Sequence, residues 1–250
     1  MSGFTALVLA GTRNLAGDGL NTATQLKAEM VLAGTRMIDR VIAALSASPH
    51  VTKIIVCGPH HLGTWENVTF FPPSTSPARS IAAFLESRTE TGPVLITTAD
   101  HALLSTAMVD HFCAQTLSMG NDLTVAMADK AMVQAAYPGT KRTGYNFRGG
   151  AWCSCNIFGV MSPNVRDVIQ FWAFVEQNRK KPLRVVAAFG WLTLLGVLLR
   201  LWTVQGALKR AGKRFGITAA PVIMPWAEAA IDVDTLNDKT LVESILAKRT

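Results

Sequence analysis

The sequence predicts an α/β protein with a mostly parallel, mixed sheet between layers of helices. Short apolar runs alternate along the chain with stretches of helical spacing, which is the pattern of such folds. The composition, 49% hydrophobic and 16% charged over 250 residues, is that of a folded globular chain with a sizeable core. We therefore expect a single domain over residues 1–250.

The first predicted element is a buried strand at Thr5–Ala10, an apolar run that ends at a glycine. A long loop follows, Gly11–Thr24, and polar loops of this length are uncommon unless they serve a function. Apolar residues at helical spacing then predict a helix at Arg36–Ser46. The same reasoning gives, in order, strands at Lys53–Cys57 and Val68–Phe71, a helix at Ser80–Glu86 and a strand at Pro93–Thr97.

The second half continues the alternation and closes on a helix that Thr235 or Asn237 can cap. Its predicted elements are a helix at Thr106–Gln115, strands at Leu123–Met127 and Trp152–Val160, a helix at Asn164–Gln177, a strand at Ala219–Met224 and a helix at Thr235–Ala247.

Residues 165–215 are expected to form a helical subregion with an apolar insertion. Val185–Leu199 carries no charge, but its roughly 15 residues fall short of the ~20 that a spanning helix needs. One interpretation is a buried helix or helix pair. The other is a segment that rests on a membrane, because Lys209, Arg210, Lys213 and Arg214 follow closely. The subregion is expected either to bind the substrate or to make peripheral membrane contact through residues 183–214.

The formal charge of +7 suits phosphorylated ligands, nucleic acid or an anionic membrane. Nucleic acid is disfavoured because the basic residues are scattered with little aromatic interleaving. The four cysteines show no zinc-site spacing and are expected to be reduced. Residues 1–11 resemble a first strand more than a signal peptide, so we expect a cytoplasmic protein, with peripheral association at the inner membrane face as the alternative.

Acidic residues stand where a parallel sheet binds ligands. Asp100 directly follows an apolar strand, at the carboxyl edge where ligands of such sheets lie, and is either a magnesium ligand or a helix cap. Asp232 and Asp234 are two apart, so on an extended segment they face the same side. They either complete a metal site with Asp100 or belong to a solvated strand end.

Phosphate-binding groups are predicted at two places. The backbone of Leu9, Ala10, Gly11 and Thr12 can cradle phosphates that Arg13 clamps, although an ordinary turn with a solvated arginine fits as well. Lys27 follows this loop and is either a phosphate ligand or a surface charge. Acceptor-binding candidates are the basic loop residues Lys141, Arg142 and Arg148, which equally fit a solvated loop, and Asn156, whose amide can bond a hydroxyl.

Several of these segments together resemble the MobA-like NTP transferase family. The opening Leu7-Val8-Leu9-Ala10-Gly11 with Arg13 and Lys27 resembles the start of the family, with Thr12 in place of a second glycine. Further similar segments are Gly34–Ile38, Pro77–Ser80, Thr98–Leu104 and Ile231–Asp238. The resemblance implies the Rossmann-like GT-A nucleotidyltransferase fold of the molybdenum-cofactor guanylyltransferases and the sugar- and polyol-phosphate cytidylyltransferases.

The resemblance also implies roles. Arg13 and Lys27 would be catalytic, and Asp100 with Asp232 or Asp234 would hold Mg²⁺ or Mn²⁺. The nucleotide would contact Leu9, Ala10, Gly11, Thr12, Ser80, Ala99 and Asp100. The expected reaction transfers a nucleoside monophosphate, CMP in preference to GMP, from a nucleoside triphosphate to a sugar, polyol or hydroxy-acid phosphate. Pyrophosphate leaves, and the product would feed lipid or envelope synthesis.

Two alternatives remain open from the sequence. A GT-A-type glycosyltransferase would use a nucleotide sugar and a D-x-D motif after a central strand. The Asp232-Val233-Asp234 segment has that form but lies near the C-terminus. A non-catalytic nucleotide-binding partner protein is the other alternative, because the loop at Gly11 departs from the family pattern.

Overall fold

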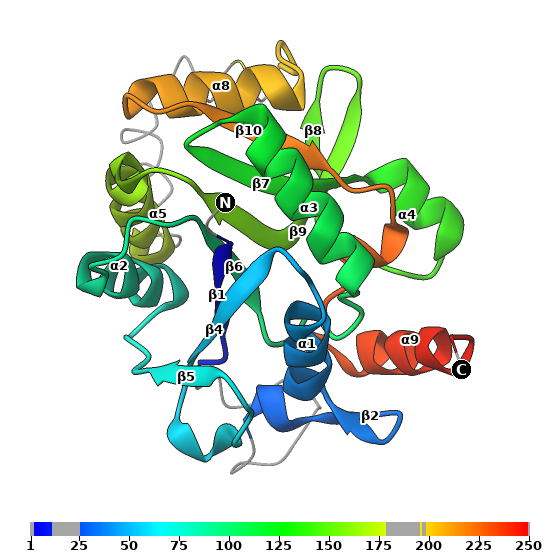
Figure 1. The fold of residues 1–250 in the computed structure, drawn as a ribbon. Coiled ribbons are helices and arrows are strands. Elements are labelled where there is room, and N and C mark those ends of the chain that lie inside the picture. The colour runs from blue at the N-terminus through cyan, green and yellow to red at the C-terminus, as the bar shows by residue number, and fades with distance from the viewer. Residues whose placement is uncertain (1–2, 12–25, 179–195, 197–198, 250) are drawn as a thin grey trace.

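The computed structural model describes residues 3–11, 26–178, 196 and 199–249. Their central element is an eight-stranded mixed sheet (Figure 1). The strand order is β10-β7-β9-β6-β1-β4-β5, and β8 pairs with β9. The strands are β1 (Phe4–Leu9), β4 (Val51–Cys57), β5 (Val68–Phe71), β6 (Val94–Thr98), β7 (Leu123–Asp129), β8 (Tyr145–Phe147), β9 (Gly150–Val160) and β10 (Ala219–Ile223). A separate hairpin joins β2 (Val31–Leu32) to β3 (Thr35–Arg36).

Most neighbouring strands are parallel, and β9 is the exception near the centre. β1 runs parallel to β4 and β6, whereas β9 runs antiparallel to β6, β7 and β8. The carboxyl ends of β1, β4 and β6 therefore open on one edge of the sheet. Ligands bind at such an edge in open α/β sheets.

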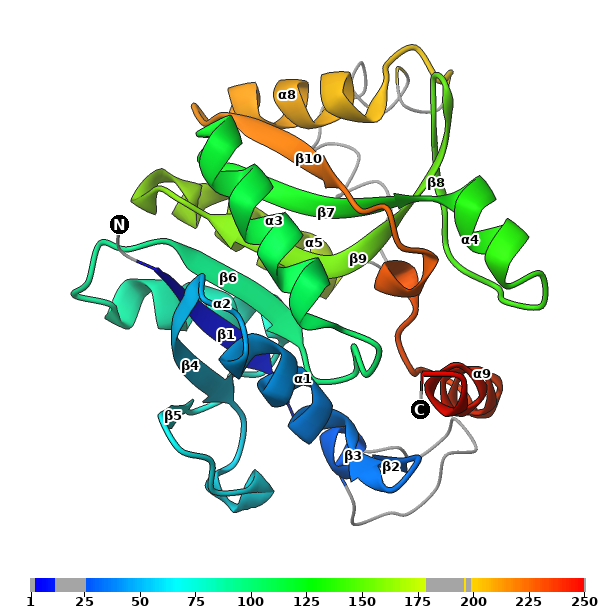
Figure 2. The ribbon, with the colours of Figure 1, turned by 45° about the vertical axis from the view of Figure 1, so that its right-hand side comes forward.

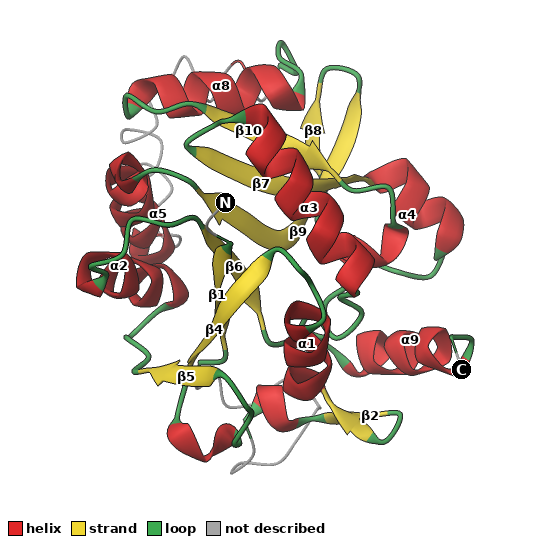
Figure 3. Ribbon diagram, viewed as in Figure 1, coloured by secondary structure: helices red, strands yellow, loops and turns green. Residues whose placement is uncertain are grey.

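Helices cover both faces of the sheet (Figure 3). They are α1 (Met37–Ser46), α2 (Pro77–Ser87), α3 (Thr106–Met119), α4 (Lys130–Ala136), α5 (Arg166–Asn178), α8 (Val204–Arg214) and α9 (Leu236–Ala247). Short 3₁₀ turns lie at Lys27–Glu29, His60–Leu62, Pro163–Val165 and Ala227–Ala230.

The alternation of side chains in β1 explains the two-sided core. Ala6 and Val8 pack in one cluster with residues of α1 and α3, and Leu7 packs in another with residues of α2 and α5. Figure 2 shows α1 and α3 on one side of the sheet and α2 and α5 on the other. A strand buried on both faces is apolar at nearly every position, and β1 departs from this only at Thr5.

The structure confirms the predicted fold class, a mostly parallel mixed sheet between helices. Element ends differ by a few residues. The helix that was expected to end at Gln115 continues to Met119, where Gly120 (φ 62°) terminates it, and the predicted helix at Asn164–Gln177 begins as a 3₁₀ turn before α5. The sequence reasoning did not predict the β2–β3 hairpin, β8, α4 or α8.

Residues 165–215 include α5, which packs on α2, and α8, which packs on β10. Most of the apolar run Val185–Leu199 lies outside the described residues, so its buried or membrane-resting placement stays a prediction. No helix among the described residues is long and apolar enough to cross a membrane. All four cysteines are free and buried.

Candidate functional site

Asp100 lies at the carboxyl edge of the sheet because β6 ends two residues before it. The amide of the buried Ala99 donates to the Leu9 carbonyl at 3.0 Å, which ties this turn to the end of β1. Ser105, not Asp100, caps the following helix α3. The carboxylate of Asp100 is therefore not used as a helix cap.

A small apolar cluster brings three distant segments to the same edge. It contains Leu32 and Met37 near the β2–β3 hairpin, Leu103 after β6, and Ile231 and Val233 before α9. The Val233 amide donates to the Asp100 carbonyl at 3.3 Å. Since Ile231 and Val233 face the cluster, the alternating side chains of Asp232 and Asp234 turn away from it toward Asp100.

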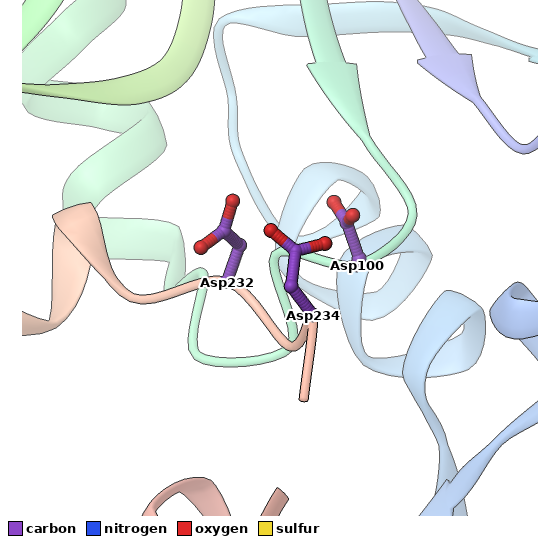
Figure 4. Close-up of side chains that lie close together, drawn as sticks. All are labelled: Asp100, Asp232 and Asp234. Atoms are coloured by element: carbon purple, nitrogen blue, oxygen red, sulfur yellow. The ribbon is translucent and has the colours of Figure 1, made fainter. Parts of the chain in front are cut away.

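The three carboxylates converge (Figure 4). One oxygen each of Asp100, Asp232 and Asp234 lie within 4.8 Å of one another. The predicted facing of Asp232 and Asp234 is therefore present in the structure. Carboxylates this close repel one another, so the site calls for a cation.

Lys27 supplies one positive charge to this group. Its ammonium lies 2.6 Å from Asp100 Oδ2 and 2.5 Å from Asp234 Oδ1. Burial alone would lower the pKa of Lys27, but the charge and hydrogen bonds of Asp100 and Asp234 raise it above its ordinary value. Burial likewise opposes ionisation of Asp100, yet Lys27 holds the pKa of this carboxyl below its usual range. Both groups are charged at neutral pH.

Asp232 is held from the other side. Arg142 forms an ion pair with its Oδ1 and donates to its backbone carbonyl at 2.9 Å, and Asn156 Nδ2 donates to Oδ2 at 3.0 Å. Asn156 has a left-handed backbone (φ 53°), rare for residues other than glycine and often found at functional sites. Burial and the neighbouring carboxylates of Asp100 and Asp234 raise the pKa of Asp232 despite Arg142. A bound cation would relieve that repulsion.

Asp238 connects this arrangement to α9. Its Oδ1 accepts from Arg142 at 2.5 Å, and its Oδ2 accepts from the backbone of Asp234 and Thr235 in a capping box. Arg142 thus contacts Asp232 directly and, through Asp238, fixes the backbone of Asp234. Arg142 and Asp238 are 96 positions apart in the chain, so the sequence carries no local signal for this contact.

The residues present suit a divalent cation. Asp100 Oδ1 and the hydroxyl of neighbouring Thr98 are both buried, and neither forms a hydrogen bond of normal geometry in the described part of the chain, although Thr98 is close enough to help lower the pKa of Asp100. Oxygen ligands from carboxylates are those that Mg²⁺ and Mn²⁺ prefer. Among the residues that the structure describes, Lys27 is the cation paired with Asp100 and Asp234, so a divalent ion would compete with it there.

The other predicted nucleotide-binding residues lie at varying places. Leu9 ends β1 beside Ala99, and Ala10 and Gly11 follow it; a side chain at the exposed Gly11 would meet no other described residue. Thr12 and Arg13 lie outside the described residues. Ser80 is buried in α2, where its hydroxyl accepts from the Ser74 amide at 2.8 Å.

Of the predicted acceptor-binding residues, Arg142 and Asn156 belong to the carboxylate group and the other two are exposed. Lys141 adjoins Arg142 in the chain. Arg148 lies in the β8–β9 turn, where its amide donates to the Trp202 carbonyl at 2.8 Å. Within the described part of the chain, no hydrogen bond or ion pair joins Ser80, Lys141 or Arg148 to the carboxylates, so their roles stay predictions. His101 is fully buried and its pKa is lowered to about 4 by burial, so it is neutral and structural.

Comparison with known proteins identifies the family. The MobA-like NTP transferase domain matches residues 6–188. The chain belongs to this family. This chain also shares its fold with solved structures. One is a hypothetical transferase from Thermus thermophilus, with a TM-score of 0.79 and 24% identity over 95% of this chain and 99% of that one.

Two cytidylyltransferases show the same fold at lower identity. A CMP:2-keto-3-deoxy-manno-octonic acid synthetase in complex with CTP has a TM-score of 0.59 and 12% identity, covering 99% of each chain. The 2-C-methyl-D-erythritol 4-phosphate cytidylyltransferase of Francisella tularensis has a TM-score of 0.60 and 12% identity, covering 96% of this chain and 99% of that one. No curated protein sequence matches the chain.

Proposed function

We propose that this MobA-like NTP transferase is a divalent-metal-dependent nucleotidyltransferase that joins a nucleoside monophosphate to a phosphorylated small molecule. The observation that carries the proposal is the convergence of Asp100, Asp232 and Asp234 at the carboxyl edge of the sheet, where Lys27 pairs with the first and the last of them. Family membership favours this reaction over glycosyl transfer and over a non-catalytic role.

In the proposed reaction, an oxygen of the acceptor phosphate attacks the α-phosphorus of the nucleoside triphosphate. The bond from that phosphorus to the bridging oxygen of the β-phosphate breaks, and pyrophosphate leaves with the electron pair. Negative charge builds up on phosphate oxygens, so catalysis depends on positioning and on nearby positive charge. No covalent bond to the protein is needed.

Asp100, Asp234 and Asp232 would hold Mg²⁺ or Mn²⁺, which when bound neutralises phosphate oxygens and polarises the phosphorus centre. Lys27 would donate to the triphosphate once its carboxylate partners have another cation to bind. The backbone at Leu9–Gly11 lies on the same edge, which suits it to approach phosphates. Thr12 and Arg13, next in the chain, are proposed to complete that grip.

The base and the acceptor are the finer parts of the proposal. Cytidine is favoured because structural neighbours include cytidylyltransferases, one of them in complex with CTP. Lys141 adjoins Arg142 and is exposed, so it is our first candidate for the acceptor phosphate, with Arg148 second. Asn156 is proposed to bond an acceptor hydroxyl in addition to Asp232, and Ser80 and Ala99 to contact the nucleoside.

The test is pyrophosphate release by the purified full chain. Each of the four ribonucleoside triphosphates is combined with Mg²⁺ and a panel of sugar, polyol and hydroxy-acid phosphates, and phosphate is measured after coupling to pyrophosphatase. We expect release to require both substrates and the metal. Absence of release with every pair, together with absence of nucleotide binding by thermal shift, would contradict the proposal.

A matched pair of variants links the activity to the carboxylates. Asp100→Asn keeps the side-chain shape but removes the charge, and we expect at least a hundredfold loss of rate. Asp167→Asn changes an exposed aspartate of α5 by the same atoms and is expected to leave the rate unchanged. Equal rates for the two variants would remove Asp100 from the catalytic site.

A further inference from the structure

The helix α8 has an exposed basic face. Lys209, Arg210, Lys213 and Arg214 are exposed, whereas Val204 and Gly212 are buried against the sheet. Gly212 permits this close packing, because a Cβ there would lie 2.7 Å from the Ile217 carbonyl oxygen and 3.1 Å from Ala219 Cβ. The helix is therefore held in one orientation on β10, with its basic residues turned outward.

Apolar side chains are exposed directly before this helix. Leu199 and Leu201 are 57% and 53% exposed on either side of the exposed Arg200. Trp202 follows, and the guanidinium of Arg210 lies 4.7 Å from the centre of its ring. Bulky apolar and indole side chains beside lysine and arginine are characteristic of surfaces that lie in the membrane interface.

The positive charge of the chain is concentrated in the stretch of sequence that includes this surface. Residues 177–227 contain nine lysines and arginines and no aspartate or glutamate, which leaves fifteen basic and seventeen acidic residues in the rest of the chain. The formal excess of +7 thus comes entirely from this stretch. A scattered solvated surface would mix both signs, so this segregation indicates an anionic partner.

We propose that Leu199–Leu201 and the basic face of α8 bind the surface of an anionic phospholipid bilayer. The lysines and arginines would lie at the level of the lipid phosphates while Leu199 and Leu201 enter the boundary with the acyl chains. Exposed leucines favour a bilayer over nucleic acid, which binds through phosphate contacts and stacking on aromatic rings. The binding is peripheral, and it is independent of the proposed nucleotidyl transfer.

The experiment is co-sedimentation of the full chain with vesicles at ~0.1 M salt. Vesicles of phosphatidylglycerol and phosphatidylcholine in equal parts are compared with vesicles of phosphatidylcholine alone. We expect binding to the first and not to the second. Each basic residue near an anionic surface strengthens binding about fivefold, so Lys209→Gln, Arg210→Gln and Lys213→Gln together should weaken it about a hundredfold.

Two further variants separate the mechanism from general charge. Lys53→Gln, Lys239→Gln and Lys248→Gln remove the same charge elsewhere and should leave binding within about threefold, since they lie outside this surface. Leu199→Ser with Leu201→Ser keeps all charges and should weaken binding at least tenfold. Thermal denaturation of each variant checks that it is folded.

Three results would overturn the proposal. One is no sedimentation of the wild-type chain with anionic vesicles. Another is an equal loss in the control triple variant. The third is binding that the leucine substitutions leave unchanged and that single-stranded DNA competes away, because the surface would then recognise polyanions in general.

Discussion

Arg142 offers a direct test of how the carboxylate group is built. Replacing it with methionine keeps most of the side-chain volume and removes the guanidinium. That guanidinium pairs with Asp232 and Asp238 and donates to the Asp232 carbonyl at 2.9 Å, and the Arg142 side chain is only 9% exposed. The change leaves two aspartates, 23% and 14% exposed, without their main partner.

The expected loss can be worked from these contacts. Removing one partner of a buried ion pair destabilises a protein by about 3–5 kcal/mol. Here Asp232 keeps Asn156 and Asp238 keeps the Thr235 cap, so we take the lower end, about 3 kcal/mol. For a chain of this size that corresponds to a fall in Tm of roughly 6–12 °C.

Urea denaturation followed by circular dichroism measures the free energy of unfolding of Arg142→Met. Lys141→Met is the matched control, because this neighbour is exposed, and its change should stay within about 0.5 kcal/mol. A double-mutant cycle with Asp238→Asn should return a coupling of about 1–3 kcal/mol. If Arg142→Met loses less than 1 kcal/mol, the pairs behave as surface pairs and the reasoning is refuted.

Three further predictions follow from other contacts. Lys27→Met should tighten Mn²⁺ binding several-fold, because the ion no longer competes with the ammonium for Asp100 and Asp234. The same variant should release pyrophosphate about a hundredfold more slowly. Weaker Mn²⁺ binding would contradict this prediction. Gly212→Ala should destabilise the protein by about 1–3 kcal/mol in urea denaturation, because the new Cβ would overlap the Ile217 carbonyl. Gly139→Ala serves as the control, since a Cβ at that position meets open space. Burial raises the pKa of the Cys113 thiol to about 12 and also raises the pKa of Cys155, so a thiol reagent at pH 8 should modify these two only after unfolding; rapid modification of Cys113 or Cys155 in the native protein would refute the burial.

The strands of the core were readable from the sequence because their signals are local. β1 is apolar at nearly every position since both of its faces are covered, and Asp100 follows directly where β6 ends. Asp232 and Asp234 were expected to face the same side of the chain. The alternating residues Ile231 and Val233 are buried on the opposite side, which produces that arrangement. These inferences need only the period of a strand and the rule for its carboxyl edge.

The elements that escaped prediction are short or weakly periodic. The β2–β3 hairpin has strands of two residues each, and α4 has only seven residues, too few for a helical period to show. The basic helix α8 has distinct basic and apolar faces, but it carries two glycines and only two large apolar residues, Val204 and Leu208, so sequence reasoning missed its helical period.

The partners of the site could not be read from the sequence for a different reason. Lys27 reaches Asp100 and Asp234 across long stretches of chain, and Arg142 reaches Asp232 and Asp238 in the same way. Opposite charges are common in any sequence, and only the fold selects which of them meet. The sequence thus identified the three carboxylates that converge but not the side chains that hold them.

The central claim is that Asp100, Asp232 and Asp234 form one divalent-cation site that serves a bound nucleotide. Electron paramagnetic resonance of free Mn²⁺ during titration measures this directly, with a non-hydrolysable CTP analogue present and Asp100→Asn, Asp234→Asn and Asp167→Asn as variants. We predict Mn²⁺ binding by the wild type and by Asp167→Asn, and at least a tenfold weaker affinity in the other two. Equal Mn²⁺ affinity in all four proteins would contradict the account.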